Sequence, residues 1–196
     1  MKNVSRSLKL WFFARENTLL GRQRLLFFAS VALTSIVLTI ASFFVSHQTA
    51  VQFVADGISM ALTAVLVFLY ARRVIRIRWA ATALYILIQL NLSVHKMVFA
   101  LEKTPESAGL IVQESFLSLL LIMVSILSVL RYSPTLISAI SLFTFSFCVI
   151  LFPTTVLYHF APVYLIVLIG AIVYDMTGVR PFLNAHADKN DHPHPA

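Results

Sequence analysis

The stretch from Leu136 to Tyr174 contains 39 residues and no Lys, Arg, Asp or Glu. The hydrocarbon layer of a bilayer is about 30 Å thick, and roughly 20 apolar residues in an α-helix can cross it. The stretch is therefore long enough for two crossings and needs a turn between them. Pro153 marks that turn, because proline is tolerated at a helix start and the residue before it avoids helical dihedral angles. This pattern predicts helices over 136–152 and 154–174.

Pro162 offers a competing position for the turn. A turn there would leave only 163–174 for the last helix, which at about 1.5 Å per residue is too short to cross the bilayer. We therefore expect Pro162 to lie inside the last helix. Because proline has no N–H, it would leave the carbonyl of Tyr158 without its helical partner, and the position would act as a hinge.

Four earlier stretches are also long and apolar enough to cross a bilayer: 25–45, 53–71, 79–101 and 110–130. The whole chain is 59% hydrophobic and 12% charged, with a mean hydropathy of +0.87. A soluble domain is usually about 45–50% apolar and about 25% charged, so this chain has too little polar surface for a water-soluble globule. The predicted fold class is an all-α membrane protein, a six-transmembrane-helix bundle over 25–174.

The basic residues predict the orientation of this bundle, because Lys and Arg concentrate in cytoplasmic segments. With both termini in the cytoplasm, 13 of the 15 Lys and Arg residues fall on the inner side, and only Lys96 and Lys103 do not. We therefore expect an N-in/C-in, multi-pass protein of a bacterial cytoplasmic (inner) membrane. The inner basic residues are Lys2, Arg6, Lys9, Arg15, Arg22, Arg24, Arg72, Arg73, Arg76, Arg78, Arg131, Arg180 and Lys189.

Two polar segments flank the predicted bundle. Residues 1–24 form a basic, cytoplasmic N-terminal segment, in which 5–20 mix charged and apolar residues at helical spacing. This pattern fits an amphipathic helix lying on the inner leaflet, and equally a basic stop signal before the first span. Residues 175–196 form a polar tail that we expect to be cytoplasmic and disordered. Each soluble segment is too short to bury an independent core.

Ionisable and amide groups inside the spans are the candidate functional residues, because such groups are costly in a bilayer and usually face the bundle interior. In the predicted topology they gather in the outer half of the bundle. The candidate ligand-binding residues are Asp56, Asn91, His95, Lys96, Glu114 and His159.

Helical rotation of about 100° per residue places Asn91 and His95 on one face of the third span, and Gln89, Ser93 and Lys96 on another. The functional hypothesis is a polar pocket open to the outside, with Lys96 paired to Glu114 and with His95 or His159 able to change charge near neutral pH. The structural alternative is that Lys96 extends to the headgroups, while serines allow close helix packing.

Several classes of function are not supported by the sequence. No catalytic motif is present, so an enzyme is not expected, and neither catalytic residues nor a metal site are assigned. His95 and His159 lie at comparable depth and raise the question of a haem between helices, but a single pair is a weak signal and no cofactor is predicted. The net charge of +7 lies at segment ends, so it indicates membrane topology and not nucleic-acid binding.

The leading functional hypothesis is a sensory or regulatory membrane protein that binds a small, partly apolar ligand in the outer half, with Pro162 relaying a change. The alternative is a small-solute transporter or the substrate-binding subunit of one. The apolar inner halves of the spans argue against transport. A third reading is a non-catalytic membrane component of a larger complex. The expected partners are the lipid bilayer, the ligand, and a membrane-protein partner or a second copy of the chain.

Overall fold

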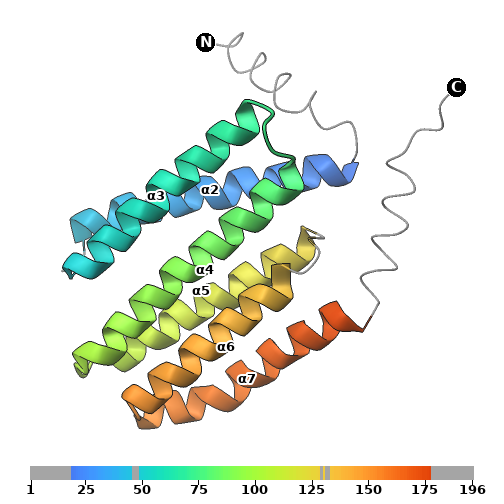
Figure 1. Cartoon of the computed structure of the whole chain (residues 1–196). Coiled ribbons are helices and arrows are strands. Elements are labelled where there is room, and N and C mark those ends of the chain that lie inside the picture. The colour runs from blue at the N-terminus through green and yellow to red at the C-terminus, as the bar shows by residue number, and fades with distance from the viewer. Residues whose placement is uncertain (1–18, 46–48, 129, 131–132, 178–196) are drawn as a thin grey trace, which may run out of the picture.

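The computed structural model describes residues 19–45, 49–128, 130 and 133–177, and this part of the chain forms six α-helices and no strand (Figure 1). All six helices are long and apolar enough to cross a membrane. The expected all-helical architecture with six helices that could span a membrane is confirmed, and it is compatible with an integral multi-pass membrane protein. The helices are α2 (Leu19–Val45), α3 (Ala50–Ala71), α4 (Ile77–Glu102), α5 (Ser107–Leu127), α6 (Ser133–Leu151) and α7 (Thr155–Met176).

Threonine side chains fix the starts of two helices. Thr49 precedes α3 and forms a capping box: its hydroxyl accepts a hydrogen bond from the Gln52 amide, and the Gln52 side chain accepts one from the Thr49 amide at 3.0 Å. Thr154 caps α7 by accepting from the Leu157 amide. Such caps satisfy amides that have no partner within the helix. The turn before α7 contains Pro153, as expected from the sequence.

The helix ends differ from the predicted spans where the first turn is polar. The stretch predicted as 110–130 begins earlier, at Ser107, because the hydroxyls of Thr104 and Ser107 lie 2.7 Å apart and order the preceding turn. The stretch predicted as 136–152 begins at Ser133, where Pro134 suits a first helical turn. The first helix begins at Leu19, within the segment predicted to precede it. Hydropathy alone does not detect polar first turns.

Helix α4 lies in the centre of the bundle. It packs against α2, α3, α5 and α6, whereas α7 packs on α5 and α6 at one edge, and α2 packs on α3 and α4 at the other. Figure 1 shows this order across the molecule, with consecutive helices running in opposite directions. A side chain of α4 can therefore reach three or four neighbouring helices.

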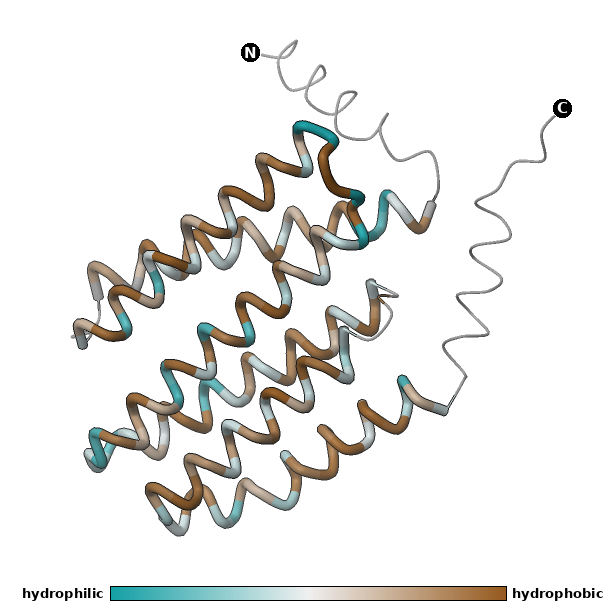
Figure 2. The backbone as a smooth tube through the Cα atoms, in the orientation of Figure 1, coloured by the Kyte–Doolittle hydropathy of each residue, from teal (hydrophilic) through white to brown (hydrophobic). Residues whose placement is uncertain are grey.

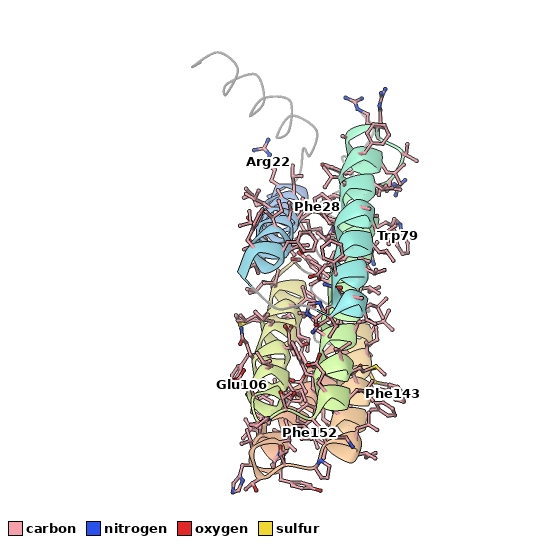
Figure 3. All side chains as sticks on the ribbon, turned by 90° about the vertical axis from the view of Figure 1, so that its left-hand side faces the viewer. Arg22, Phe28, Trp79, Glu106, Phe143 and Phe152 are labelled. Atoms are coloured by element: carbon pink, nitrogen blue, oxygen red, sulfur yellow. The ribbon has the colours of Figure 1, made fainter. Side chains whose placement is uncertain are left out.

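The two ends of the bundle differ in charge. Arg22 and Arg24 lie at the start of α2, and Arg72, Arg73 and Arg76 lie in the turn between α3 and α4. The Arg24 Nε donates to the carbonyl of Ser128 at 3.2 Å, which places the start of α2 beside the end of α5. We call this end the arginine-rich end, and we call the half of the bundle away from it the far half. In Figure 3 Arg22 lies toward the first, and Glu106 and Phe152 toward the second.

Apolar side chains cover the outside of every helix, and the interior is unusually polar. Figure 2 shows the apolar residues distributed along all six helices. Phe44, Phe143 and Ile150 are each at least 75% exposed, which suits contact with lipid. The core contains many buried hydroxyl groups. They include Ser59, Thr63, Ser93, Ser107, Ser115, Ser118, Ser125, Ser128, Ser133, Ser138, Ser141 and Thr144.

The predicted N-terminal amphipathic helix (5–20) lies almost wholly outside the described residues, and so does most of the predicted polar tail (175–196). Of the tail, Asp175 and Met176 continue α7, and Thr177 caps it. The Asp175 side chain accepts a hydrogen bond of 2.5 Å from Thr135 of α6, which connects the end of α7 to the start of α6.

Candidate functional site

Asp56 of α3 is the centre of a buried polar cluster in the far half. Its side chain is 3% exposed, and its Oδ1 accepts a hydrogen bond from Asn91 Nδ2 at 2.8 Å. The Nε2 of His95 lies 3.1 Å from the same oxygen and donates to it. Asn91 and His95 lie four residues apart on α4, so both side chains point from one helix face toward α3. The shared face predicted from the sequence is confirmed.

Glu114 of α5 lies on the other side of the His95 ring. Its Oε1 is 3.7 Å from His95 Nδ1, within the distance of an ion pair when the imidazole is protonated. The imidazole therefore lies between two carboxylates that come from different helices. We call Asp56, Asn91, His95 and Glu114 the His95 cluster. It connects α3, α4 and α5, and its own charge changes when His95 gains or loses a proton.

The His95 cluster has hydrogen-bond acceptors that are not used within the protein. Asn91 Oδ1 and Glu114 Oε2 are both buried atoms without a hydrogen-bond partner. An unpaired buried acceptor costs free energy, so the cluster is suited to receive a proton or a donor group of a ligand. His95 and Glu114 are partly open, with side chains 13% and 15% exposed.

Lys96 is adjacent to His95 in sequence but lies in a different interface. It is 0% exposed, and its Nζ donates to Ser118 of α5 at 3.1 Å and to Ser141 of α6 at 3.4 Å. Among the described residues, both ion pairs involve His95 and neither involves Lys96. The predicted pairing of Lys96 with Glu114 is therefore wrong. The physical reason is rotation: one residue turns the helix by about 100°, so Lys96 faces hydroxyls while His95 takes the carboxylates.

Tyr164 of α7 extends the surroundings of Lys96, and the sequence prediction missed it. Its hydroxyl is hydrogen-bonded to Ser141, and the whole residue is buried. Ser141 was also missed, although α6 carried a detectable signal: Ser138, Ser141, Thr144 and Cys148 recur at helical spacing and are all buried. Uncharged hydroxyl groups in apolar helices are a weak sequence signal because they also occur as simple packing residues.

His159 does not join the His95 cluster. It lies exposed near the start of α7, and its Nδ1 donates to the carbonyl of Thr155 in the same helix at 2.7 Å. Helix α7 packs on α5 and α6 and lies across the bundle from α3. Pro162 lies inside α7, which continues through it as one helix. The bending role expected of Pro162 remains a prediction.

The geometry of the His95 cluster can be compared with the requirements of a metal ion and of a haem. Within the described helices no three His, Cys, Asp or Glu side chains are grouped to hold one metal ion. Asp56 and Glu114 approach opposite nitrogens of the imidazole, so the two carboxylates do not converge on one point. The two histidines considered for haem differ in setting, because His95 is enclosed between carboxylates and His159 is exposed.

Compared with models of known protein families, with curated proteins and with solved structures, the chain has no match.

Proposed function

We propose that the protein is a sensory or regulatory membrane protein, and that the His95 cluster is the site that receives its signal. The signal is a small ligand or a proton that reaches the far half. The arginine-rich end faces the cytoplasm in this proposal, because basic residues concentrate on that side of a membrane. The far half then faces outward, which places the His95 cluster near the outer surface of an inner membrane.

The observation that carries the proposal is the position of the His95 imidazole between Asp56 of α3 and Glu114 of α5. A change of charge on His95 alters its attraction to both carboxylates together, and each belongs to a different helix. In a low-dielectric interior such a change is weakly screened. It would therefore shift the balance between two arrangements of α3, α4 and α5, which is what a sensor requires.

The test is a distance measurement across the cluster. Spin labels at Val51→Cys on α3 and Gln113→Cys on α5, both exposed positions, report the separation of the two helices when Cys148 is replaced by Ala. We expect this distance to change in lipid nanodiscs between pH values of about 5 and about 10, a range wide enough to include the change of charge of a histidine that lies between two carboxylates. The change should be absent in His95→Gln.

His159→Gln is the matched control, because His159 is an exposed histidine outside the cluster. It should leave the pH-dependent change in distance as in the parent protein. If the two labels keep one distance at both pH values, or if His159→Gln removes the change as fully as His95→Gln does, the sensory proposal is wrong.

Transport is the second candidate, and one structural observation favours it. Uniformly apolar inner halves of the spans would disfavour transport. The core there is not uniformly apolar: Tyr85, Ser125 and Ser128 are 0% exposed and lie toward the arginine-rich end. Polar side chains thus occur in the core on both sides of the membrane centre.

A further inference from the structure

A line of buried polar side chains runs along α4 on the face that meets α5 and α6. Its members on α4 are Tyr85, Gln89, Ser93 and Lys96, which are each 7% exposed or less. Residues three or four apart lie on the same helix face. With a rise of about 1.5 Å per residue, each member lies roughly 4.5–6 Å along the axis from the next. We call these four residues the polar stripe.

Hydroxyl groups of neighbouring helices contact three members of the polar stripe, namely Lys96, Ser93 and Tyr85. Thr144 of α6 donates to Ser93 at 3.1 Å, which is the contact midway along α4. Gln89 also donates to Ser93, and the Tyr85 hydroxyl lies 3.0 Å from that of Ser128. Together with the two hydrogen bonds of Lys96, these contacts place hydrogen-bonding groups along most of the length of α4.

Gln89 leaves one strong acceptor unused in the middle of the polar stripe. Its residue is 0% exposed, and its Oε1 is buried without a hydrogen-bond partner. Ser138 of α6 is also 0% exposed, and its hydroxyl oxygen is likewise buried without a hydrogen-bond partner. Unsatisfied polar atoms deep in a membrane protein are costly, and they occur where a polar species passes or binds.

Lys96 is the ionisable member of the polar stripe, and its hydrogen bonds go to neutral groups. A carboxylate would hold the ammonium proton through an ion pair, but Ser118 and Ser141 are neutral hydroxyls. Ser118 also joins the two polar regions, because its Oγ accepts from Lys96 and donates to the carbonyl of Glu114. Glu114 thus lies one helical turn of α5 away from the serine that contacts Lys96.

We propose that the polar stripe is a proton path across the bundle, an activity beyond the sensory function proposed above. A proton arrives at Glu114 or His95 in the far half and reaches Lys96, which passes between ammonium and neutral amine. Water molecules that hydrogen-bond to Ser93 and to the unused acceptor of Gln89 then carry it from Lys96 to Tyr85 and Ser128. At each hop one N–H or O–H bond breaks as another forms, and rotation of the water molecules and hydroxyl groups afterwards restores the starting arrangement.

The experiment measures proton flux in liposomes that contain the purified full-length protein and an entrapped pH-sensitive dye. A potassium gradient with valinomycin sets the membrane potential. The protein should raise the flux above that of protein-free liposomes. Lys96→Arg keeps the positive charge but does not release its proton, and Gln89→Leu removes the amide at similar size. Both variants should reduce the flux to the level of protein-free liposomes.

Two exposed residues of the same types provide matched controls. Gln113→Leu and Lys103→Arg alter positions outside the polar stripe and should conduct like the parent protein. Helix content and monodispersity show whether each variant is folded. If Lys96→Arg does not fold, the flux of the Gln89→Leu variant decides the test. Flux no higher than in protein-free liposomes, or full flux in the folded Gln89→Leu variant, would overturn the proposal. The distance measurement across the His95 cluster is independent of either result.

Discussion

His95 and Lys96 are consecutive residues of α4, yet their side chains belong to different helix interfaces. The His95 ring lies between Asp56 of α3 and Glu114 of α5, while the Lys96 ammonium is hydrogen-bonded to Ser118 and Ser141. A rotation of α4 by a few degrees would alter both sets of contacts together. One central helix thus carries both the His95 cluster and the polar stripe.

His95→Leu should destabilise the protein. The substitution removes the hydrogen bond from His95 to Asp56, whose side chain is 3% exposed, while the bond from Asn91 stays. Loss of one partner of a buried polar group costs about 1–3 kcal/mol. The measurement is the free energy of unfolding in mixed micelles. His159→Leu, at an exposed position, should change it by less than about 0.5 kcal/mol. Equal losses in the two variants would contradict the assignment of His95 to a buried cluster.

The sequence predicted the fold well because each helix is determined by a local property. A run of about 20 apolar residues is sufficient to specify a spanning helix, and a proline such as Pro153 is sufficient to specify a turn. The helix starts at Ser107 and Ser133 were predicted three residues too late. These helix starts depend on side-chain contacts of single hydroxyl groups. The mean hydropathy of a stretch does not detect such contacts.

The candidate site was predicted only in part, because it depends on how the helices are rotated against one another. Asp56, Asn91, His95 and Glu114 come together as expected from their depth. The predicted depth in the membrane grouped His159 with these four residues. It could not exclude His159, because residues at the same depth can lie on opposite edges of a bundle. The hydrogen-bond partners of Lys96 lie on α5 and α6, and their hydroxyl groups carry no charge that would distinguish them in the sequence.

Tyr164→Phe should lower stability by about 1 kcal/mol, the typical net contribution of one hydrogen bond. The variant loses the hydroxyl that is bonded to Ser141 but keeps the aromatic packing, since the Tyr164 ring centroid lies 4.6 Å from that of Phe145. Thermal unfolding in detergent tests this expectation. Tyr158→Phe is the control because Tyr158 is 58% exposed. No difference between the two midpoints would mean that the Tyr164 hydroxyl contributes nothing to the core.

Arg24→Met should loosen the arginine-rich end of the bundle. The Arg24 Nε donates to the carbonyl of Ser128, and the neighbouring Gln23 side chain donates to that of Leu127 at 2.9 Å. Carbonyls at the end of a helix have no partner within it, and a positive side chain there is favourable. We expect a loss of about 1–2 kcal/mol, measured by chemical unfolding. Arg76→Met alters an exposed residue and should unfold like the parent protein. If Arg76→Met lowers the free energy of unfolding as much as Arg24→Met does, the effect is one of charge in general and not of the Arg24 hydrogen bond.

The proposed orientation predicts which loops can be reached from outside the cell. Glu106→Cys, between α4 and α5, and Arg76→Cys, between α3 and α4, are exposed positions at opposite ends of the bundle. Since basic residues concentrate on the cytoplasmic side, a membrane-impermeant maleimide should modify Glu106→Cys in intact cells when Cys148 is replaced by Ala. Arg76→Cys should react only after the membrane is permeabilised. The reverse pattern would place the arginine-rich end outside, and the His95 cluster would then receive its proton or ligand from the cytoplasm.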